Sequence, residues 1–533
     1  VTVNLRAWAQ GAFQDDPYVT MVTNNISYGA IGSFSWDDNG LIYDAQGVIT
    51  GVRNPFRFSV SANATNDHVI PFLLTMTGVN GMNPSDNTTY SFQSRFNLMV
   101  QRGKEVSGEI AENTTWTANW LYLVVGNIRI LPGATLTIEP GARMQFNRGF
   151  RLQVDGTLRA VGTASNSIIF TSNSLSPRPG DWHEIQFSDS SSDAVFDETG
   201  NYVGGNIMKY SIVEYAGTSQ AGPAFAGIRI FNSSPFITNS IIRYNYGNND
   251  GSGIQIYGGS PVITKNIIRY NVWQGIGAGG TPVIKNNLII QNIGIGSGFL
   301  WNGKGINVGS ANAVIKYNSL FSNPIDIIYN GSGDVDLTDN YWGTTDPDSI
   351  AAHIWDYWDD FGRGKVQFKP FLTAPSPDAP PILYQVSISP SSPVSAENVT
   401  FTLTFSRDMD TTVPPIVAFG PDEPYTDYTI AGSWTGARTW VGSFKVTSAT
   451  GDGWQSIYVA NARDATEGME IPVDTRFRFE IITSGTEAMN LQATGGEGYI
   501  DLMWTQDDFD LLAGYNLYRA TTVNGNYIRL NST

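Results

Sequence analysis

Apolar and polar side chains alternate with a period of two along most of the chain. The alternation is clearest in three stretches, Phe56–Val60, Ile70–Met76 and Val399–Phe405. Because successive side chains of a β-strand point to opposite faces, this pattern predicts half-buried strands. One helix is expected, over Ser349–Asp359. The pattern therefore predicts an all-β fold.

Four segments of the middle of the chain repeat one pattern, in which a short apolar strand, a polar residue and a second apolar strand follow one another. They begin at Pro235, Pro261, Pro282 and Ala313. One such unit cannot bury its own apolar face, so the units are expected to stack as a solenoid with like residues above like. Ile263, Ile284 and Ile315 would then line the interior in one row.

Asparagine recurs at two fixed positions of these repeats. Asn tolerates the left-handed backbone of a sharp turn, and stacked amides can bond from one coil to the next. We therefore predict a structural asparagine column with a second one beside it. The first column, which Ser240 begins, contains Asn266, Asn287, Asn318 and Asn340, and the second contains Asn245, Asn271, Asn292 and Asn323.

Turn clusters and the extent of the repeats divide the chain into four parts. Residues 1–106 are expected to form a β-sandwich, 107–375 the solenoid, 382–484 a second sandwich and 486–533 part of a third. The Pro-rich stretch Thr373–Pro381 is expected to be a linker.

Composition excludes several kinds of chemistry. The chain of 533 residues has no Cys and three His, so disulfide scaffolds, thiolate zinc sites and multi-histidine metal sites are not expected. With 31 basic and 48 acidic residues the net charge is −17, which disfavours nucleic acid as a partner. No apolar run reaches the length of a membrane-spanning helix.

Several motifs of the repetitive part resemble a known family. ILPGATLTIEPGARMQF (130–146), LQVDGTLRAVGT (152–163) and GDWHEIQF (180–187) resemble the opening coils of secreted right-handed parallel β-helix repeat proteins. DNYWGTTDPDSI (339–350) resembles their closing coil. The resemblance implies a right-handed parallel β-helix in a secreted or cell-surface protein. It does not imply one activity, because the fold carries enzymes, adhesins and spacers.

The flanking parts resemble extracellular β-sandwich modules. VTFTLTFSRDMD (399–410) is similar to bacterial immunoglobulin-like domains, and LQATGGEGYIDLMW (491–504) resembles the first half of a fibronectin type III domain. DPYVTMV (16–22) with NPFRFSVSANATNDHVIPFLLTMT (54–77) resembles β-sandwich modules of large surface or secreted proteins, often beside a peptidase domain. Since 486–533 is too short for a complete domain, we expect either a longer natural chain or coverage of this end by another copy.

Residues that could catalyse are sparse on the central repeats. Between Ile207 and Pro324 the only acids are Glu214 and Asp250, whereas glycoside hydrolysis needs a pair of carboxylates at a controlled separation. No catalytic residue is therefore assigned. His183, which lies next to Glu184, is interpreted as a structural histidine.

Two acidic turns are candidates for binding calcium, the one cofactor considered. They contain Asp334, Asp336 and Asp339 near the end of the solenoid, and Asp408 and Asp410 in the second sandwich. Carboxylate-rich turns suit Ca²⁺, and solvated cap or turn residues are the alternative interpretation.

Aromatic residues in or near the coils could stack against sugars or pack loops onto the solenoid. These residues are Tyr257, Trp273, Trp301 and Tyr317. Glycans therefore stay among the partners considered.

Three functions are compatible with the sequence. The first is a non-catalytic extracellular building block or spacer, which assembles with copies of itself through its terminal sandwiches. The second is a carbohydrate-binding or polysaccharide-processing β-helix protein. The third is the non-catalytic tail of a secreted peptidase. The first is preferred because stacking accounts for the repeats and catalytic residues are scarce.

Overall fold

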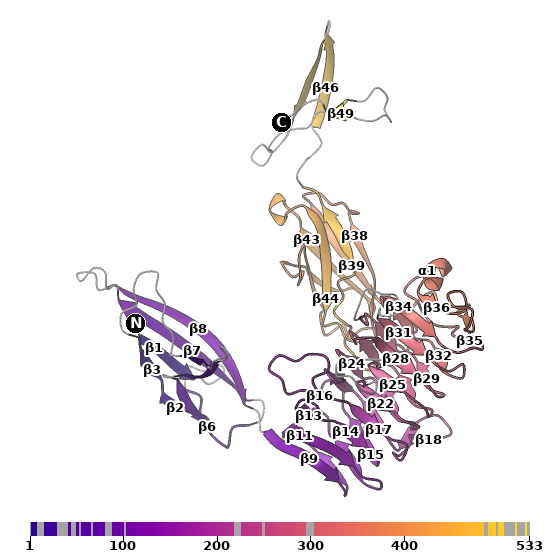
Figure 1. Ribbon diagram of the computed structural model, residues 1–533. Helices are drawn as coiled ribbons and strands as arrows, with labels where there is room; N and C mark the ends of the chain where they lie inside the picture. The colour runs from indigo at the N-terminus through magenta and orange to yellow at the C-terminus, as the bar shows by residue number, and fades with distance from the viewer. Residues whose placement is uncertain are drawn as a thin grey trace.

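The computed structural model confirms an all-β chain built around long stacks of parallel strands (Figure 1). It describes residues 2–7, 15–28, 41–43, 49–52, 55–65, 68–79, 88–100, 103–217, 225–247, 251–294, 303–483, 489–496, 499–505, 518–519 and 528–529. The predicted residues Asp250 and Trp301 lie outside these ranges.

The N-terminal part forms an antiparallel sheet in the order β3-β1-β7-β8, with the pair β2–β6 packed on it and a separate pair β4–β5. Phe72 of β7 is buried between Phe58 of β6 and Phe96 of β8, so two layers share one small core. The strands are β1 (Thr2–Ala7), β2 (Val19–Thr23), β3 (Asn25–Ser27), β4 (Leu41–Tyr43), β5 (Ile49–Val52), β6 (Arg57–Val60), β7 (His68–Val79) and β8 (Thr89–Val100).

The middle of the chain is a parallel β-helix with three sheets. The long strands β9 (Gly103–Ile110) and β11 (Leu121–Ile130) begin both the second and the third sheet. The first coil thus begins at Gly103, four residues before the predicted boundary. Each strand pairs in parallel with the equivalent strand of the next coil, so each coil advances the chain by the spacing between two hydrogen-bonded strands.

The first sheet contains β10 (Thr114–Trp116), β12 (Thr135–Ile138), β15 (Thr157–Val161), β20 (Ile207–Lys209), β23 (Phe236–Thr238), β26 (Val262–Thr264), β29 (Val283–Lys285) and β32 (Val314–Lys316). The second contains β13 (Arg143–Phe146), β16 (Ile168–Ser172), β21 (Ser211–Glu214), β24 (Ile241–Arg243), β27 (Ile267–Arg269), β30 (Leu288–Ile290) and β33 (Ser319–Phe321). The third contains β14 (Leu152–Val154), β17 (Ile185–Phe187), β22 (Ile228–Ile230), β25 (Ile254–Ile256), β28 (Gln274–Ala278), β31 (Lys304–Val308), β34 (Ile325–Tyr329) and β36 (Ile354–Trp355).

The interior of the β-helix is filled by rows of aliphatic side chains. Ile263, Ile284 and Ile315 are fully buried and lie in register on neighbouring strands of the first sheet. Comparable rows run up the other two sheets, and all three rows share one core. Because every coil contributes to this core, its stability depends on contact with the coils above and below.

The predicted helix Ser349–Asp359 is wrong over most of its length. Helix α1 covers only Pro347–Ala351, capped by Asp346, and Ile354–Trp355 form strand β36 instead. The carbonyl of His353 accepts the amides of Asp326 and Ile327, so pairing with β34 overrides the helical pattern. Two short pairs lie outside the main sheets, β18 (Val195–Phe196) with β19 (Tyr202–Gly204) and β35 (Val335–Asp336) with β37 (Val366–Gln367).

Residues 382–483 form a sandwich of two four-stranded antiparallel sheets over one core. Phe401 and Phe479 face each other across that core at a centroid distance of 5.4 Å. One sheet contains β38 (Leu383–Ser389), β39 (Asn398–Phe405), β43 (Thr439–Lys445) and β42 (Ala431–Trp434). The other contains β41 (Tyr428–Thr429), β40 (Ile416–Gly420), β44 (Gly453–Ala460) and β45 (Arg478–Ile481), and a short 3-10 helix spans Ser448–Thr450.

This sandwich docks directly on the flank of the β-helix. Met469 packs with Ile267 and Leu288 in an apolar cluster, and Lys265 forms an ion pair of 2.5 Å with Glu467. The stretch predicted as a linker joins this contact, since the Ser376 hydroxyl bonds the side-chain oxygen of Asn286 at 2.9 Å. The two modules are therefore held together by more than their covalent connection.

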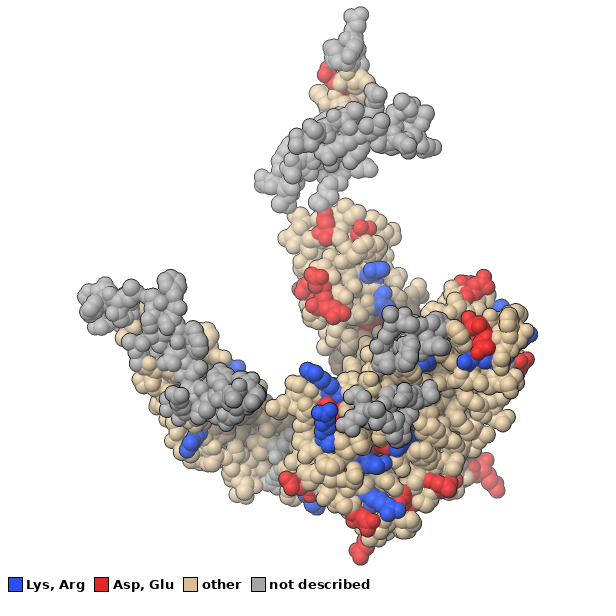
Figure 2. Space-filling view, viewed as in Figure 1, with Lys and Arg blue, Asp and Glu red and all other residues tan. Residues whose placement is uncertain are grey.

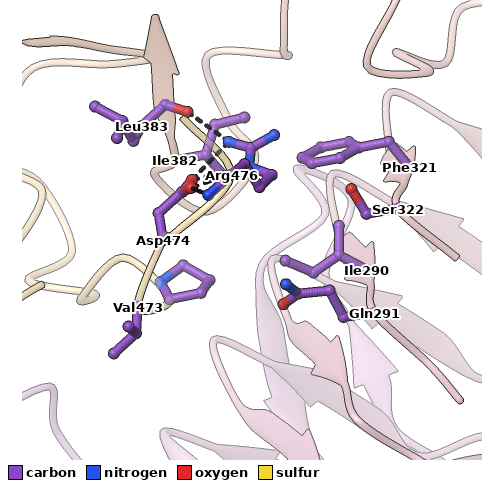
Figure 3. A pocket seen from close by; sticks show the side chains of 10 residues that line it. Ile290, Gln291, Phe321, Ser322, Ile382, Leu383, Val473, Asp474 and Arg476 are labelled. Atoms are coloured by element: carbon purple, nitrogen blue, oxygen red, sulfur yellow. Dashed lines mark hydrogen bonds and ion pairs between the residues drawn. The ribbon is translucent and has the colours of Figure 1, made fainter. Parts of the chain in front are cut away.

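A cavity of about 10 Å³, the size of one water molecule, remains at this junction (Figure 3). Ile290 and Phe321 line it from the β-helix. Arg476 lines it from the sandwich, held by Asp474 at 2.6 Å and by the carbonyl of Leu383 at 2.8 Å. The cavity is too small for an organic ligand and belongs to the packing of the interface.

The last described elements are two separate strand pairs beyond the sandwich. They are β46 (Met489–Gly496) with β47 (Tyr499–Thr505) and β48 (Tyr518–Arg519) with β49 (Ile528–Arg529). Figure 1 shows them at the far end of the molecule from the first coil.

Candidate functional site

The structure places the predicted asparagines of the first column directly above one another inside the turn between the first and second sheets. The side-chain oxygen of Asn318 accepts both the backbone amide of Asn287 at 2.9 Å and its side-chain amide at 3.0 Å. Asn266 bonds Asn287 in the same way, and Asn318 bonds Asn340. All four are fully buried, so each amide satisfies backbone groups of a turn that water does not reach.

The reason given for asparagine in the sequence was wrong in one respect. The residue with the left-handed backbone is the one before each column asparagine: Lys265, Asn286, Tyr317 and Asp339 have φ between 54° and 61°. The column asparagine itself is selected for its amide, which bonds the turn above and the turn below.

The second asparagine column uses the same bonds and is covered by glycines. The side-chain amide of Asn271 donates to the side-chain oxygen of Asn292 at 3.1 Å. A Cβ at Gly253 would lie 2.8 Å from the side-chain nitrogen of Asn271 and 2.8 Å from the carbonyl oxygen of Gly275. Glycine is therefore required where the chain passes over this column.

The outer face of the third sheet carries the most unusual charges of the molecule. Glu184 is fully buried there and forms an ion pair of 2.6 Å with Arg229 and a longer one of 3.7 Å with Arg151. Burial raises the pKa of Glu184 to about 7, although both arginines oppose the shift. This buried ion pair joins two neighbouring coils, because Glu184 and Arg229 are 45 residues apart in the sequence.

His183 does not join this group as a proton donor or acceptor. Its ring packs against Phe225 at 4.9 Å, and its Nδ1 is buried with no hydrogen-bond partner among the described residues. Burial and the nearby charges of Arg151 and Arg229 lower the pKa of His183. The arrangement agrees with the interpretation of a structural histidine.

Other acids on the long sheets are also held by arginines. Glu214 pairs with Arg243 at 2.8 Å, and Asp155 pairs with Arg129 at 2.6 Å. Carboxylates held in this way are poorly placed to activate water or protonate a leaving group. The described part of the long sheets therefore offers no pair of uncommitted carboxylates.

Two of the candidate calcium ligands near the end of the β-helix, Asp336 and Asp339, meet at the ammonium of Lys316. Asp336 accepts the ammonium of Lys316 at 2.7 Å, which with Thr338 lowers the pKa of Asp336 to about 2. Asp339 lies 3.7 Å from Lys316, and Asp334 accepts the backbone amide of Lys365.

In the second sandwich, Asp408 pairs with Arg438 at 2.6 Å, and Asp410 accepts the hydroxyl and amide of Thr412. Over the described ranges no three acidic or histidine side chains gather as a metal site would require. Calcium binding stays a prediction.

The predicted aromatic residues have different surroundings. Tyr257 stacks on Phe231 at 5.0 Å and Tyr317 is partly exposed, whereas Trp273 is buried beneath the ammonium of Lys304. Sequence reasoning missed Trp358 and Phe361, the two most exposed aromatic side chains among the described residues of the β-helix, because it placed the first in a helix and did not consider the second.

The terminal modules expose apolar strands. Strand β8 lies at the edge of its sheet, with no described strand on its outer side. Phe92 and Phe96 of β8 are 60% and 43% exposed, and Ile500 and Met503 of β47 are 69% and 65% exposed. The alternation in TYSFQSRFNLMV (89–100) was the sequence signal for the first of these surfaces.

Comparison with known families agrees with this architecture. Residues 108–274 match the family model described as a pectate-lyase like beta helix domain. The match and the three stacked sheets together define the chain as a parallel β-helix protein. No curated protein and no solved structure gives a match. Within the described ranges, no helix is long and apolar enough to cross a membrane.

Proposed function

We propose that this chain is a non-catalytic extracellular building block that assembles head to tail through its terminal β-modules. The observation that carries the proposal is the exposed apolar face of the edge strand β8. A long exposed edge strand recruits further strands unless it is covered.

Strand β8 is the edge strand of its sheet, and Phe92 and Phe96 lie on the same face of the sheet as the small core. In the register with β7, Phe92 lies opposite Met76 and Phe96 lies opposite Phe72, which is fully buried. The rings of Phe72 and Phe96 stack at 5.2 Å. The outer strand therefore repeats the inner pattern, but its side chains are exposed along nearly all of its length, which suits the addition of a strand from a partner.

The hairpin β46–β47 supplies a complementary strand pair at the other end of the chain. Its Ile500 and Met503 are exposed, and an isolated two-stranded hairpin is marginal in water. Residues 88–104 contain three bases and no acid, a net of +3, and residues 489–505 contain two acids and no base, a net of −2. The two segments therefore carry opposite net charge, which favours their association.

A contact between β8 of one copy and β46–β47 of the next would be heterologous, and it propagates into a filament unless it closes into a ring. The rigid β-helix with its docked sandwich would then set the spacing between contacts. The commitment of Glu184, Glu214 and Asp155 to arginines supports a role without catalysis. Export from the cell is proposed from the resemblance of the modules to secreted proteins.

Sedimentation velocity over a range of concentrations tests this function. We expect the wild-type chain to form species larger than a dimer, visible by negative-stain microscopy, and the double variant Phe92→Asp, Phe96→Asp to stay monomeric. Leu175→Asp, on a fully exposed side chain of the β-helix, is the control. A wild-type monomer at every concentration, or equal assembly of the double variant, would contradict the proposal.

A polysaccharide-processing role is the second candidate, favoured by the family match over residues 108–274. Incubation with pectin and alginate separates the two functions. The building-block proposal expects no unsaturated or reducing ends above the buffer control. A peptidase tail, the third possibility from the sequence, has no structural observation in its favour.

A further inference from the structure

A cluster of aromatic side chains protrudes from the turn after β36, at the closing end of the β-helix. Trp358 and Phe361 are 73% and 80% exposed. The ring of Tyr357 contacts both, at centroid distances of 5.4 Å to Trp358 and 5.3 Å to Phe361. We name these three residues the aromatic platform.

Hydrogen bonds on both sides of the platform fix the backbone of its turn. The buried carboxylate of Asp356 accepts the amide of Trp358 at 3.0 Å and the amide of Val366 at 2.7 Å. Asp360 accepts the guanidinium of Arg363 at 3.0 Å, and Arg363 in turn donates to the carbonyl of Tyr329 at 2.7 Å. The turn is thus tied to the last coils of the β-helix at several points.

Two large rings held in water on a braced turn need an explanation. Exposed apolar groups lower stability relative to polar ones and, where they gather, mark interaction sites. The platform takes no part in the core of the β-helix beneath it. Its exposure therefore points to a ligand.

The polar groups around the platform indicate what that ligand is. Lys365 places its ammonium 5.0 Å from the ring centre of Tyr357 and 5.2 Å from that of Trp358. Asp359 and Asp360 neighbour these residues in the sequence, and their carboxylates accept the backbone amide of Asp356 at 3.2 Å and the guanidinium of Arg363 at 3.0 Å. The rings stand edge-on to one another, at 83° and 65° to Tyr357, so each exposed ring offers its own flat face. Such a face beside the ammonium of Lys365 matches a pyranose, whose C–H face packs on a ring and whose hydroxyls bond polar groups at the edge.

The net charge at the closing end of the β-helix distinguishes between neutral and acidic sugar ligands. In Figure 2 acidic side chains gather near the end of the β-helix where α1 lies. Residues 346–365 contain five Asp against the two bases Arg363 and Lys365, a net of −3, and the whole chain has a net charge of −17. An acidic polysaccharide or an anionic lipid surface would be repelled. We propose that the aromatic platform binds neutral pyranose polysaccharides.

Calorimetric titration of the full chain with cellohexaose, and separately with chitohexaose, tests the proposal. We expect at least one of the two neutral oligosaccharides to bind and to shift tryptophan fluorescence to the blue. Oligogalacturonate of the same length is expected not to bind. The double variant Trp358→Ala, Phe361→Ala is expected to weaken binding at least ten-fold.

Trp454→Ala removes an exposed tryptophan of the second sandwich and is the matched control, expected to bind like the wild type. Phe92→Asp, Phe96→Asp should also bind normally, so that failure of assembly and failure of glycan binding are distinguishable. Absence of binding to both neutral probes, preference for oligogalacturonate, or unchanged affinity of the double variant would overturn the proposal. So would loss of assembly in the double variant, since a second copy would then cover the platform.

Discussion

Asn287 gives two hydrogen bonds to a single atom of Asn318, the side-chain oxygen of the residue one coil further on. Its own side-chain oxygen receives the same two bonds from Asn266. The coils are thus joined by a continuous chain of buried amides, in which each member depends on both neighbours.

Replacing Asn287 by Ala should destabilise the β-helix by about 2–4 kcal/mol. The substitution leaves the two donors of Asn266 without their acceptor in a buried turn, and each unsatisfied group costs about 1–3 kcal/mol. Urea unfolding followed by circular dichroism measures the change. Asn312→Ala, on an exposed turn of the same coil, is the control and should change stability by less than about 0.5 kcal/mol. Equal unfolding free energies of the two variants would show that the hydrogen bonds of the column do not stabilise the β-helix.

Gly253→Ala should destabilise the β-helix by crowding the second asparagine column. The added methyl group would lie 2.8 Å from both a side-chain nitrogen of the second column and a backbone oxygen, neither of which can move easily. The expected loss is about 1–3 kcal/mol. Gly204→Ala, where a Cβ meets nothing within 4 Å, provides the comparison. Thermal unfolding of both variants measures the difference, and equal melting temperatures would contradict the requirement for glycine at position 253.

Glu184 should make stability depend on pH. Its pKa is raised from the ordinary value of 4.5 to about 7 in the folded chain, so unfolding releases a proton between these values. Stability should therefore fall as pH rises from about 4.5 to about 7, by an amount on the order of a few kcal/mol, and then level off.

The difference in unfolding free energy between wild type and Glu184→Gln isolates this effect, because the glutamine does not titrate. We expect the wild type to lose stability relative to the variant across that interval. Glu198→Gln, on an exposed side chain, controls for the general effect of removing one charge. A difference that stays constant from pH 4 to pH 8 would be inconsistent with a buried Glu184.

The docked sandwich should come away from the β-helix when its apolar contact is broken. Met469→Asp places a carboxylate among Ile267, Leu288 and Ile290, where it cannot be solvated, at a cost of several kcal/mol. Small-angle X-ray scattering should then show a larger radius of gyration with no loss of strand content. Leu175→Asp is again the control, and an unchanged scattering profile of Met469→Asp would mean that other contacts hold the sandwich.

Periodic features of this fold could be predicted from the sequence, whereas contacts between distant segments could not. The spacing of Ile263, Ile284 and Ile315 is enough to predict stacked coils, since one residue type returns at one position. The hydrogen bond from the Tyr210 hydroxyl to the carbonyl of Glu467 joins residues 257 positions apart, and no local sequence pattern predicts it. The immunoglobulin-like and fibronectin type III assignments of the flanking modules stay predictions.

The candidate sites follow the same division. The alternation in residues 89–100 is typical of a strand, but only the order of strands in the sheet shows that β8 has an open side. Trp358 was assigned to a helix as part of SIAAHIWDYWD (349–359). Strand pairing of Ile354 with Ile327, 27 positions earlier, ends that helix and turns the tryptophan outward.

The central claim is head-to-tail contact between β8 and β46–β47, and disulfide trapping tests it most directly because the chain has no cysteine of its own. One chain carries Ser94→Cys in β8, and a second carries Asp501→Cys in β47. Mixed and oxidised, the two are predicted to give a cross-linked dimer at many times the yield of a mixture in which Glu198→Cys replaces either partner. A yield no higher than that control would contradict the account.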